Sequence, residues 1–339
     1  MRSEPAGSTS PDVSVVIVNY ERPELTTRCL AAAGRAIART VAMAETIIVD
    51  NGSKDSSLET FKREAPWATV IRIPTNGPLP AAMNRGWTAA TGRWVLMLNN
   101  DVVLEDRALA EALQVGESSA EVGSVALQMR FASRPDVINS AGISVDRLGV
   151  PFDLSIGHAV PAGESGPTEV FGACGAAALY RREMLASLGG FDESFGFGFE
   201  DVDLSWRAQM HGWRSFVAPR AVAFHAHGGT VPTGSTFRSY QGGRNRVRLL
   251  AKHAPTRLLR RYGAAMVLYD TAYVAYVVAR QRTLAPLTGR LRGVREWRTY
   301  RDAGRADRRD VELAPVEGIR AALRRRSAWS AFASQGHSG

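Results

Sequence analysis

Carboxylates and amides that could bind a metal ion occur together at Asn99-Asn100-Asp101, directly after the apolar run 94–98. Oxygen ligands of this kind suit a hard divalent cation, Mg²⁺ or Mn²⁺. Mg²⁺ commonly takes only one or two protein carboxylates and completes its shell with water and substrate phosphates. One aspartate is therefore sufficient in principle, and Asp101 is the candidate ligand.

A denser acidic cluster, Glu200-Asp201-Val202-Asp203, follows a stretch rich in glycine and aromatic residues at 189–198. If a helix begins near Glu200, these carboxylates lie at its positive end, where anions are stabilised. Capping would explain Glu200 or Asp203 alone. Three carboxylates behind an aromatic loop favour a further role, that of a general base towards a hydroxyl nucleophile.

Two histidines, His225 and His227, follow the apolar run 220–224 and precede a glycine pair. Either imidazole could approach a metal or a diphosphate. We expect that only one of the two does so. A structural role for both histidines remains the alternative.

The segments that must position these residues alternate between apolar β-branched runs and helical stretches, a pattern typical of a parallel α/β sheet. The expected strands are 13–18, 45–49, 68–73 and 94–98, and the expected helices are 24–38 and 81–90. Polar residues follow the carboxyl ends of three of these strands, where open α/β sheets bind ligands. Turn formation or helix capping could explain any one of them, but not three in succession.

Several enzyme and metal-site classes are disfavoured because their motifs are missing. The chain has no GxGxxG after its first strand, no GxxxxGK[ST] and no GxSxG, which argues against dehydrogenases, P-loop NTPases and α/β-hydrolases. Its two cysteines, Cys29 and Cys174, lack zinc spacing, and we expect both to be reduced. Residues 1–12 are polar and lack the apolar region of a signal peptide, so we expect no signal peptide. We expect these residues to form a disordered N-terminus.

Charge is distributed unevenly along the 339 residues, which carry a net charge of +9. Residues 1–230 hold 20 Lys and Arg against 26 Asp and Glu, whereas residues 231–339 hold 22 against 7. The basic character therefore belongs to the C-terminal third and suggests an anionic partner for it. Nucleic acid is disfavoured, because the arginines do not fall in a recognisable reading module and the rest of the chain is acidic.

The ordered series of motifs resembles the family 2 glycosyltransferases, especially their bacterial rhamnosyltransferase-like branch. The segments that carry the resemblance are VSVVIVNYERPEL, IIVDNGSKD, NGPLPAAMNRGWTAATGRWVLMLNND, FGACGAAALYRREML, LGGFDESFGFGFEDVDLSWR and HAHGGT. The resemblance covers roughly residues 13–230. It implies a GT-A nucleotide-diphospho-sugar transferase fold, an α/β fold with a mostly parallel central sheet flanked by helices, followed by a helical basic C-terminal extension.

The resemblance also assigns roles to residues. The nucleotide and donor would be held by Asn19, Tyr20, Glu21, Asp50, Asn84, Arg85, Asn99 and Asn100. Asp50 would lie near the base or ribose. Asn99-Asn100-Asp101 occupies the place of the family's DxD motif and keeps only its last aspartate, so Asp101 would hold Mg²⁺ or Mn²⁺, with His227 approaching the metal or diphosphate. Asp201, in the pair Glu200-Asp201, would be the catalytic base.

The function implied is an inverting transfer of a sugar from a nucleotide-diphosphate donor to a hydroxyl of a cell-envelope or lipid-linked glycan. We take dTDP-L-rhamnose as the first donor candidate, and UDP-galactofuranose or another UDP-sugar as the second. A sugar nucleotidyltransferase would show a Gly-rich phosphate loop with a nearby Lys or Arg, which VNYERPE lacks. A non-catalytic glycan-binding or assembly protein would more easily have lost Asp101 or Asp201.

Residues 231–300 form the expected helical, basic extension, and residues 301–339 an Arg-rich tail that we expect to be mobile. Within the extension, 15 of the 18 residues 262–279 are hydrophobic, with arginines on both flanks. Asp270 in the middle of this run disfavours a membrane span, because it would cost about 2.5–3.5 kcal/mol on insertion. We expect the helix to lie at an anionic membrane surface on the cytoplasmic side; packing on the catalytic domain is the alternative.

Overall fold

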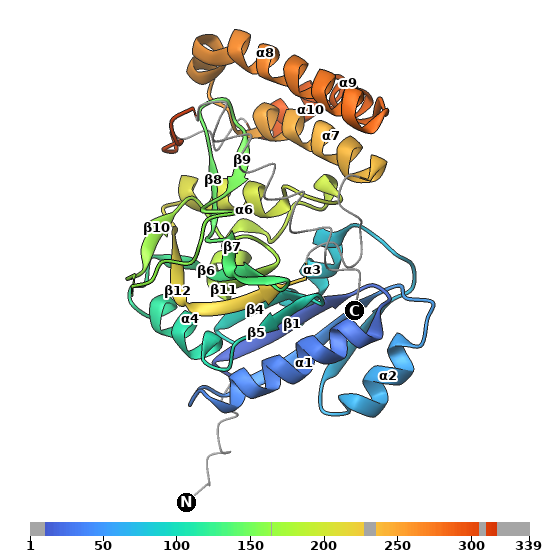
Figure 1. The fold of residues 1–339 in the computed structure, drawn as a ribbon, viewed down its shortest axis with the longest axis vertical. Coiled ribbons are helices and arrows are strands. Elements are labelled where there is room, and N and C mark those ends of the chain that lie inside the picture. The colour runs from blue at the N-terminus through green and yellow to red at the C-terminus, as the bar shows by residue number, and fades with distance from the viewer. Residues whose placement is uncertain (1–10, 164, 227–234, 305–309, 317–339) are drawn as a thin grey trace, which may run out of the picture.

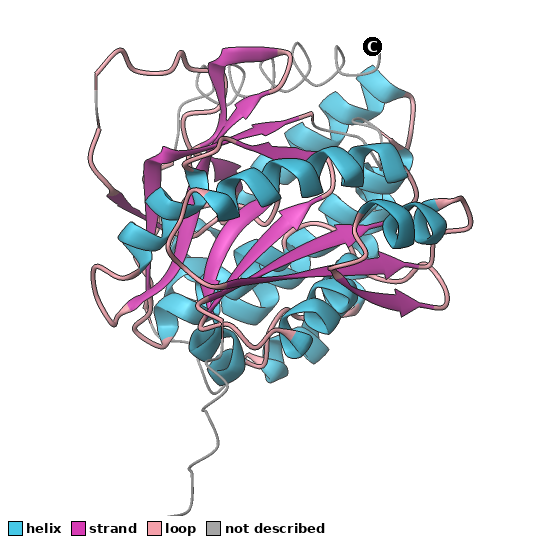
Figure 2. Ribbon diagram, turned by 90° about the horizontal axis from the view of Figure 1, so that it is seen from below, coloured by secondary structure: helices cyan, strands magenta, loops and turns pink. Residues whose placement is uncertain are grey.

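The computed structural model describes residues 11–163, 165–226, 235–304 and 310–316. A twisted sheet with helices on both faces forms the lower part of the molecule in Figure 1, and a layer of C-terminal helices lies above it. Figure 2 shows the sheet from below, with helices in front of it and behind it.

The N-terminal half of the sheet is parallel. β1 (Val13–Asn19) lies between β2 (Ala44–Asn51) and β4 (Trp94–Asn99), and β3 (Thr69–Ile73) extends the sheet beyond β2. Every residue of β1 is buried, as its continuous β-branched run predicts for a strand covered on both faces. The four strands expected from the sequence are thus present. The connecting helices are α1 (Pro23–Ala38), α2 (Ser57–Glu64) and α3 (Leu79–Ala89).

The other half of the sheet mixes strand directions. β11 (Ala177–Arg181) runs antiparallel between β4 and β6 (Val122–Phe131), and β12 (Arg214–His225) pairs in parallel with β6. Short strands complete it: β5 (Val102–Leu104), β7 (Arg134–Ser140) and β10 (Thr168–Val170), beside a separate hairpin of β8 (Ile143–Val145) and β9 (Pro151–Asp153). The helices here are α4 (Ala108–Gly116), α5 (Arg182–Leu188), the 3₁₀ turn η1 (Glu193–Phe195) and α6 (Glu200–Met210).

The register of the parallel strands brings their carboxyl ends together. Asn19 is opposite Asp50, and Val18 is opposite Asn99. The polar residues that follow the strands therefore meet at one edge of the sheet, which is where ligands bind in open α/β folds.

The C-terminal helices are α7 (Thr236–His253), α8 (Thr256–Gln281), α9 (Ala285–Arg295) and α10 (Trp297–Ala303). α7 and α9 approach each other closely at glycines. A Cβ on Gly243 would come within 2.5 Å of Pro286 O, and one on Gly289 within 2.1 Å of Tyr240 O. The absence of side chains at these two positions allows the two backbones to pack directly.

α7 packs into the catalytic part of the chain, although it lies beyond the boundary that we expected at residue 230. Leu249 is fully buried in one apolar cluster with Phe195 and Trp206. The segment 310–316 joins the same cluster through Val311 and Leu313. It also bonds to the β8–β9 region, where Ala314 N–H donates to Val145 O over 2.9 Å. We had expected this segment within a mobile tail, but it contributes to a packed core.

α8 lies on the outside of the helical layer. It is the one helix among the described residues whose length and hydropathy would suffice to cross a membrane, and 11% of its most apolar window is buried. Asp270 faces inward, where its Oδ1 lies 2.8 Å from Arg246 Nε and 2.7 Å from Arg290 Nη2. The acidic residue in the middle of α8 is therefore paired inside the protein, and it is not on the helix's outer face.

Candidate active site

The ends of β1 and β2 are joined by a small hydrogen-bond network. Asn19 Nδ2 donates to Asp50 Oδ1 (2.9 Å) and to Ser53 Oγ (3.0 Å), while Thr26 Oγ1 donates to Asn19 Oδ1 (2.7 Å). Asn19 and Asp50 are both fully buried. Asp50 therefore lies beneath the surface of the expected nucleotide pocket and fixes Asn19 and the Ser53 turn above it.

The chain leaves β1 in a strained conformation. Glu21 and Arg22 both adopt left-handed backbone angles, with φ of 55° and 57°, a conformation that costs energy for non-glycine residues and clusters at functional sites. The Glu21 N–H donates to Ser53 Oγ (2.7 Å), and the Arg22 N–H to Asp55 Oδ2 (3.0 Å). These bonds hold half-buried Tyr20 and Glu21 at the mouth of the strand-end site.

Asp101 meets a histidine at the end of β12. His225 Nε2 lies 3.3 Å from Asp101 Oδ1, and His225 Nδ1 lies 2.9 Å from Asn139 Oδ1. Because an amide oxygen only accepts, Nδ1 donates its hydrogen to Asn139, and Nε2 is the ring nitrogen that lies next to Asp101. A carboxylate oxygen beside an imidazole nitrogen is a ligand pair that could hold a divalent cation. His227 lies outside the described residues.

Glu200 and Asp201 begin α6 as expected. Asp201 Oδ2 accepts from the Gly175 N–H (2.9 Å), and Oδ1 from the Val202 N–H (2.8 Å). Burial raises the pKa of Asp201, and these two N–H groups oppose the rise. Burial, followed by the charge of Asp201, raises the pKa of Glu200 to about 8. At neutral pH Glu200 is therefore protonated and uncharged, and Asp201 is the carboxyl of the pair that can lose its proton.

The segment 174–176 links the acidic pair to the strand ends. Gly175 donates to Asp201, and the neighbouring Ala176 accepts from the Asn99 N–H over 2.9 Å. Asp153 on β9 lies in the same region, where its charge interacts with Asp201 and with His225. Burial raises the pKa of Asp153 to about 6, against a hydrogen bond from Ser140. The candidate base and the candidate metal ligand thus belong to one site.

Asn84 and Arg85 lie on α3, but within the part of the chain that the structure describes only Asn84 hydrogen-bonds to the loop before α6. Asn84 ties α3 to the loop before α6: Nδ2 donates to Phe191 O and to Glu193 Oε1, and Oδ1 accepts from Phe191 N–H, each over 2.9 Å. Arg85 is exposed on the surface of the helix. In this structure Asn84 therefore holds the loop with its amide.

Asp203, the third carboxylate of the cluster, forms part of the protein interior. Its Oδ1 lies 2.7 Å from both Lys252 Nζ and His253 Nε2, and its Oδ2 lies 2.9 Å from Arg207 Nε. Burial by itself would raise the pKa of Asp203, but the charges of Arg207 and Lys252, with the hydrogen bond from His253, outweigh it and hold the pKa well below its usual range. A carboxylate so fully paired joins α6 to α7 and is unsuited to accept a proton from substrate.

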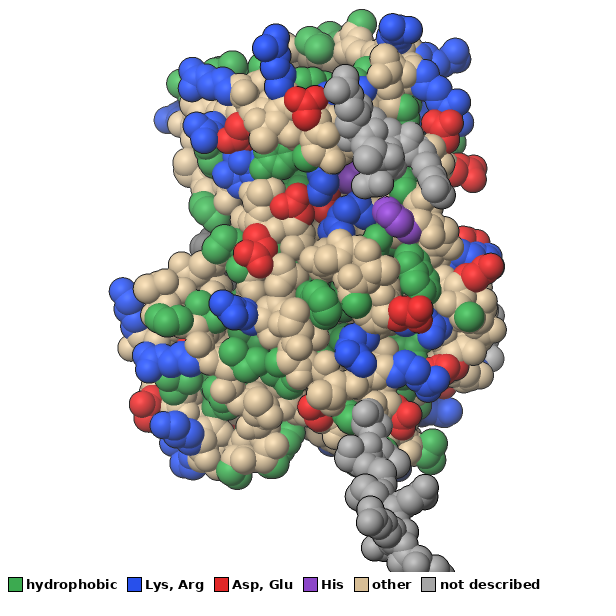
Figure 3. Space-filling view, turned by 180° about the vertical axis from the view of Figure 1, so that it is seen from behind, with side chains coloured by type: hydrophobic (Ala, Val, Ile, Leu, Met, Phe, Trp, Pro, Cys, Tyr) green, Lys and Arg blue, Asp and Glu red, His purple; other side chains and the backbone are tan. Residues whose placement is uncertain are grey.

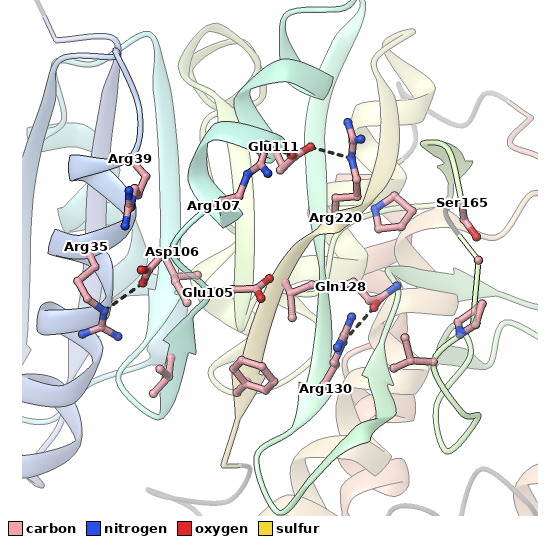
Figure 4. Close-up of a pocket in the computed structure, with 18 of the residues that line it drawn as sticks. Arg35, Arg39, Glu105, Asp106, Arg107, Glu111, Gln128, Arg130, Ser165 and Arg220 are labelled. Carbon is pink, nitrogen blue, oxygen red and sulfur yellow. Dashed lines mark hydrogen bonds and ion pairs between the residues drawn. The ribbon is translucent and has the colours of Figure 1, made fainter.

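A separate cleft of about 1030 Å³ opens between α1, β5, β12 and the loop around Ser165 (Figure 4). Side chains at 220, 222 and 224 of β12 line it, and His225 projects from the opposite face of that strand because side chains alternate. Its arginines pair mostly with its own acidic residues, as in Arg35–Asp106 and Arg220–Glu111. Asp101, His225 and Asp201 are not among the residues that line this cleft.

Several residues of the site escaped sequence analysis. Ser53 lies in the turn after β2, and the others come from elements distant in the chain: Asn139, Asp153, Gly175 and, from α7, Asn245. Only Ser53 and Gly175 lie in motifs recognised from the sequence. His225 was one of two histidines weighed there, and the structure places it beside Asp101. Among the described residues, no group of three or more His, Cys, Asp or Glu side chains converges to hold a metal.

Comparisons with known proteins identify the family of the chain. The sequence family described as "Glycosyltransferase like family 2" matches residues 11–247. The O-antigen biosynthesis protein RfbC of Myxococcus xanthus is 29% identical over 229 residues, which cover 64% of this chain and only 17% of that longer protein. The N-acetylglucosaminyl-diphospho-decaprenol L-rhamnosyltransferase of Mycobacterium tuberculosis is 26% identical over 243 residues, which cover 62% of this chain and 75% of the relative.

Two solved structures share the fold. GalNAc-T7, crystallised with UDP, GalNAc and Mn²⁺, superposes with a TM-score of 0.61 at 14% identity, covering 86% of this chain and 58% of its own. The mannosyltransferase PcManGT from Pyrobaculum calidifontis, in complex with GDP-Man and Mn²⁺, gives 0.54 at 18% identity, covering 96% and 89%. The chain therefore belongs to the glycosyltransferase-like family 2 and is a glycosyltransferase with the GT-A fold.

Proposed function

We propose that the protein transfers a sugar, with inversion, from a nucleotide-diphosphate donor to a hydroxyl of a glycan acceptor, with Asp201 as the general base. The observation that carries the proposal is the link through Gly175 and Ala176, which brings Asp201 to the end of β4. A base beside the strand ends can take the proton of an acceptor hydroxyl as its oxygen attacks the anomeric carbon. Attack from the side opposite the diphosphate inverts that carbon.

Asp201 is suited to this task by its hydrogen bonds. Two backbone N–H groups orient its carboxylate, and burial raises its pKa, which makes the carboxylate a better proton acceptor. Glu200 stays protonated below about pH 8 and so adds no second negative charge beside the base at neutral pH. We assign Glu200 to this supporting role.

A divalent cation fits between Asp101 and His225. The carboxylate oxygen suits Mg²⁺ or Mn²⁺, and an imidazole nitrogen beside it favours Mn²⁺ of the two. When bound, the cation would neutralise the charge that develops on the departing diphosphate. Asn139 holds His225 in the tautomer that such a site requires. GalNAc-T7 and PcManGT were each solved with Mn²⁺, which supports the same choice.

The donor nucleotide is proposed to bind at the ends of β1, β2 and β4. Asn19, Tyr20 and Glu21 would line its pocket, with Asp50 fixing them from beneath and Asn99 and Asn100 closing the side next to Asp101. We propose dTDP-L-rhamnose as the donor, supported by the name of the mycobacterial relative, an L-rhamnosyltransferase. UDP-galactofuranose or another UDP-sugar is the second candidate.

The acceptor is proposed to be a cell-envelope glycan linked to a lipid, used at the cytoplasmic face of the membrane. That mycobacterial relative is named for a decaprenol-linked substrate. The outer face of α8 suits such a location, because Val267 and Leu268 are 67% and 72% exposed and arginines flank the apolar stretch. Figure 3 shows Lys and Arg side chains around the helical layer with hydrophobic side chains between them. An anionic bilayer matches this arrangement.

The function is tested by release of nucleotide diphosphate and by product formation. Purified protein with Mn²⁺ is given dTDP-L-rhamnose or UDP-sugars, together with N-acetylglucosaminyl-diphospho-polyprenol as acceptor. We expect acceptor-dependent release of dTDP and a product with inverted anomeric configuration. Turnover with a UDP-sugar alone would move the donor assignment to the second candidate, and no turnover with any donor would contradict the proposal.

The membrane surface is tested by sedimentation with lipid vesicles. We expect the protein to bind vesicles that contain phosphatidylglycerol and to bind pure phosphatidylcholine poorly. Leu268→Glu should lose binding, because it puts a negative charge in the apolar face of α8. Val41→Glu, an exposed apolar residue outside the helical layer, is the matched control and should bind like the wild type. Equal loss in both variants, or self-association in place of vesicle binding, would contradict the assignment.

A further inference from the structure

One face of α7 is lined with donors that contact the loop 192–198, which leads into α6. The cationic donors are spaced so that they share that face of the helix. Arg244 Nη2 donates to Phe195 O (2.9 Å), Arg248 Nη1 to Ser194 O, and Lys252 Nζ to Asp192 Oδ2 (2.7 Å). The basic residues that the sequence suggested for an anionic partner are in part used inside the protein.

Asn245 is the member of this face that reaches the end of the loop. It is fully buried. Its side-chain Nδ2 lies 2.8 Å from Phe195 O, 3.1 Å from Phe197 O and 2.7 Å from Gly198 O. An amide nitrogen has two hydrogens to donate, so three carbonyl groups share one NH₂ group. A single side chain thus hydrogen-bonds to three backbone carbonyl groups in the segment that immediately precedes α6.

The loop needs such a donor because of its backbone conformation. Gly196, Gly198 and Phe199 have φ of 74°, 78° and 74°. Residues with positive φ in close succession curl the chain, so the carbonyl oxygens of Phe195, Phe197 and Gly198 all lie within hydrogen-bond distance of one amide, and Phe195 O also accepts from the Phe197 N–H (2.8 Å). Phe199 is not a glycine and is strained in this conformation. Without Asn245, Phe195 O would keep its bonds from the Phe197 N–H and Arg244, but Phe197 O and Gly198 O would lose the buried amide that they share, and the loop would have reason to relax.

The end of the loop is also the start of the candidate catalytic helix. Phe199 caps α6, and Glu200 and Asp201 form its first turn. One turn along α7 from Asn245, Leu249 packs in the apolar cluster that contains Val202 of α6. The contacts of α7 therefore act on both sides of Asp201, through the backbone before it and the packing behind it.

We propose that Asn245 is a positioning residue for the transfer reaction: by fixing the carbonyl groups of 195–198, its amide sets the first turn of α6 and holds Asp201 against the Gly175 N–H. The inference rests on the proposed role of Asp201 as the base. Asn245 itself touches neither donor nor acceptor in this account. Its effect is on where the carboxylate sits when the acceptor hydroxyl arrives.

The test is a double-mutant cycle of Asn245→Ala and Asp201→Asn, with kcat and the donor KM measured for all four proteins. A displacement of about 1 Å in a reacting group can cost about 10²-fold in rate, so we expect Asn245→Ala to lower kcat by roughly 10- to 100-fold. The donor KM should change less than about twofold, because Asn245 contacts the loop before α6 and not the strand ends where the donor is proposed to bind. In the Asp201→Asn background, the same substitution should lower kcat by less than about twofold.

Two further variants keep the result interpretable if Asn245→Ala folds poorly. Asn245→Gln retains the amide on a longer side chain and should restore part of the lost kcat. Ser239→Ala, on the same helix, removes a 2.9 Å hydrogen bond from Oγ to Gln281 on α8 and no contact with the loop, so its kcat should match the wild type. Melting temperatures of all variants verify that each is folded at the assay temperature.

The outcomes separate the positioning role from the base assignment. Equal losses of kcat from Asn245→Ala in both backgrounds would overturn the positioning role, because the residue would then act independently of Asp201. A higher donor KM with unchanged kcat would overturn it too. If Asp201→Asn alone keeps full kcat, the base assignment fails first, whatever Asn245→Ala does.

Discussion

The site has two halves that the chain builds in different ways. At the strand ends, Asn19, Asp50 and Ser53 bond to one another within a short stretch of sequence. At the start of α6, Asp201 depends on Gly175 and on a loop that Asn245 holds from α7. The first half comes from adjacent parallel strands, and the second is assembled from segments far apart in the chain.

The halves also differ in their electrostatics. In the α6 half, burial raises the pKa of both Glu200 and Asp201. At the strand ends, the Asp50 carboxylate is kept in place by the Asn19 amide and the Ser53 turn. The difference suggests a division of labour: a preorganised binding surface on the strands, and a proton acceptor at the helix whose pKa depends on burial. Each of the following changes tests that division.

Removing the carboxylate of the base should give the largest effect. We expect Asp201→Asn to lower kcat by about 10²–10⁴-fold, the contribution typical of a positioned general base. Nucleotide binding should persist, because it belongs to the other half. Steady-state kinetics with a parallel binding titration measure both; a variant with normal turnover would show that the proton goes elsewhere.

Asp101→Ala should affect the strand-end half. We expect it to weaken nucleotide binding at least about 10-fold when Mn²⁺ is present, and little when the metal is removed by chelation, because its contribution runs through the metal. Calorimetric titration with and without Mn²⁺ measures the difference. Equal weakening in the two conditions would argue that Asp101 contacts the nucleotide without a metal.

Asn139→Ala should give a smaller loss in the same half. It removes the partner that fixes the tautomer of His225, and changes of this kind typically cost about 10–100-fold in metal affinity. We expect a higher Mn²⁺ concentration for half-maximal activity, with kcat at saturating Mn²⁺ close to that of the wild type. An unchanged Mn²⁺ requirement would show that His225 does not bind the metal.

Glu200→Gln should change stability more than activity. The folded-state pKa of Glu200 is about 8, above its ordinary value of 4.5, so folding retains a proton that the unfolded chain loses. The stability of the wild type therefore falls as pH rises from about 4.5 to about 8. Glutamine cannot ionise, so the melting temperature of the variant should gain a few degrees on the wild type between pH 5 and 8. A constant difference would mean that Glu200 is already ionised at pH 5.

The features predicted correctly from the sequence are those that depend on a local pattern of residues. The apolar runs before Asn19, Asp50 and Asn99 predicted the parallel strands, and the family match confirms the resemblance that the motifs carried. The antiparallel insertion of β11 and the approach of Asn139 to His225 had no local signal, because strand order and contacts distant in sequence depend on the whole fold. The roles of the site residues remain predictions.

The basic C-terminal third shows the limit most clearly. Composition suggested an anionic partner, yet Arg246 and Arg248 are almost completely buried. Arg246 donates to Gly149 O and Leu148 O and pairs with Asp270. A count of charges cannot distinguish arginines that satisfy buried carbonyl groups from arginines that face a partner. Among the described residues, α8 keeps the exposed apolar stretch between arginines that the sequence suggested.

The central claim is that the strand-end half binds a nucleotide diphosphate through a metal at Asp101. The most direct measurement is the melting temperature of the purified protein with dTDP, UDP or GDP, each with and without Mn²⁺. A nucleotide at about 100 times its Kd stabilises the folded state by about 2.7 kcal/mol, so binding should be plain. We predict that one nucleotide, with dTDP as the first candidate, raises the melting temperature, and that it does so only when Mn²⁺ is present. No rise with any nucleotide, or a rise indifferent to Mn²⁺, would contradict the claim.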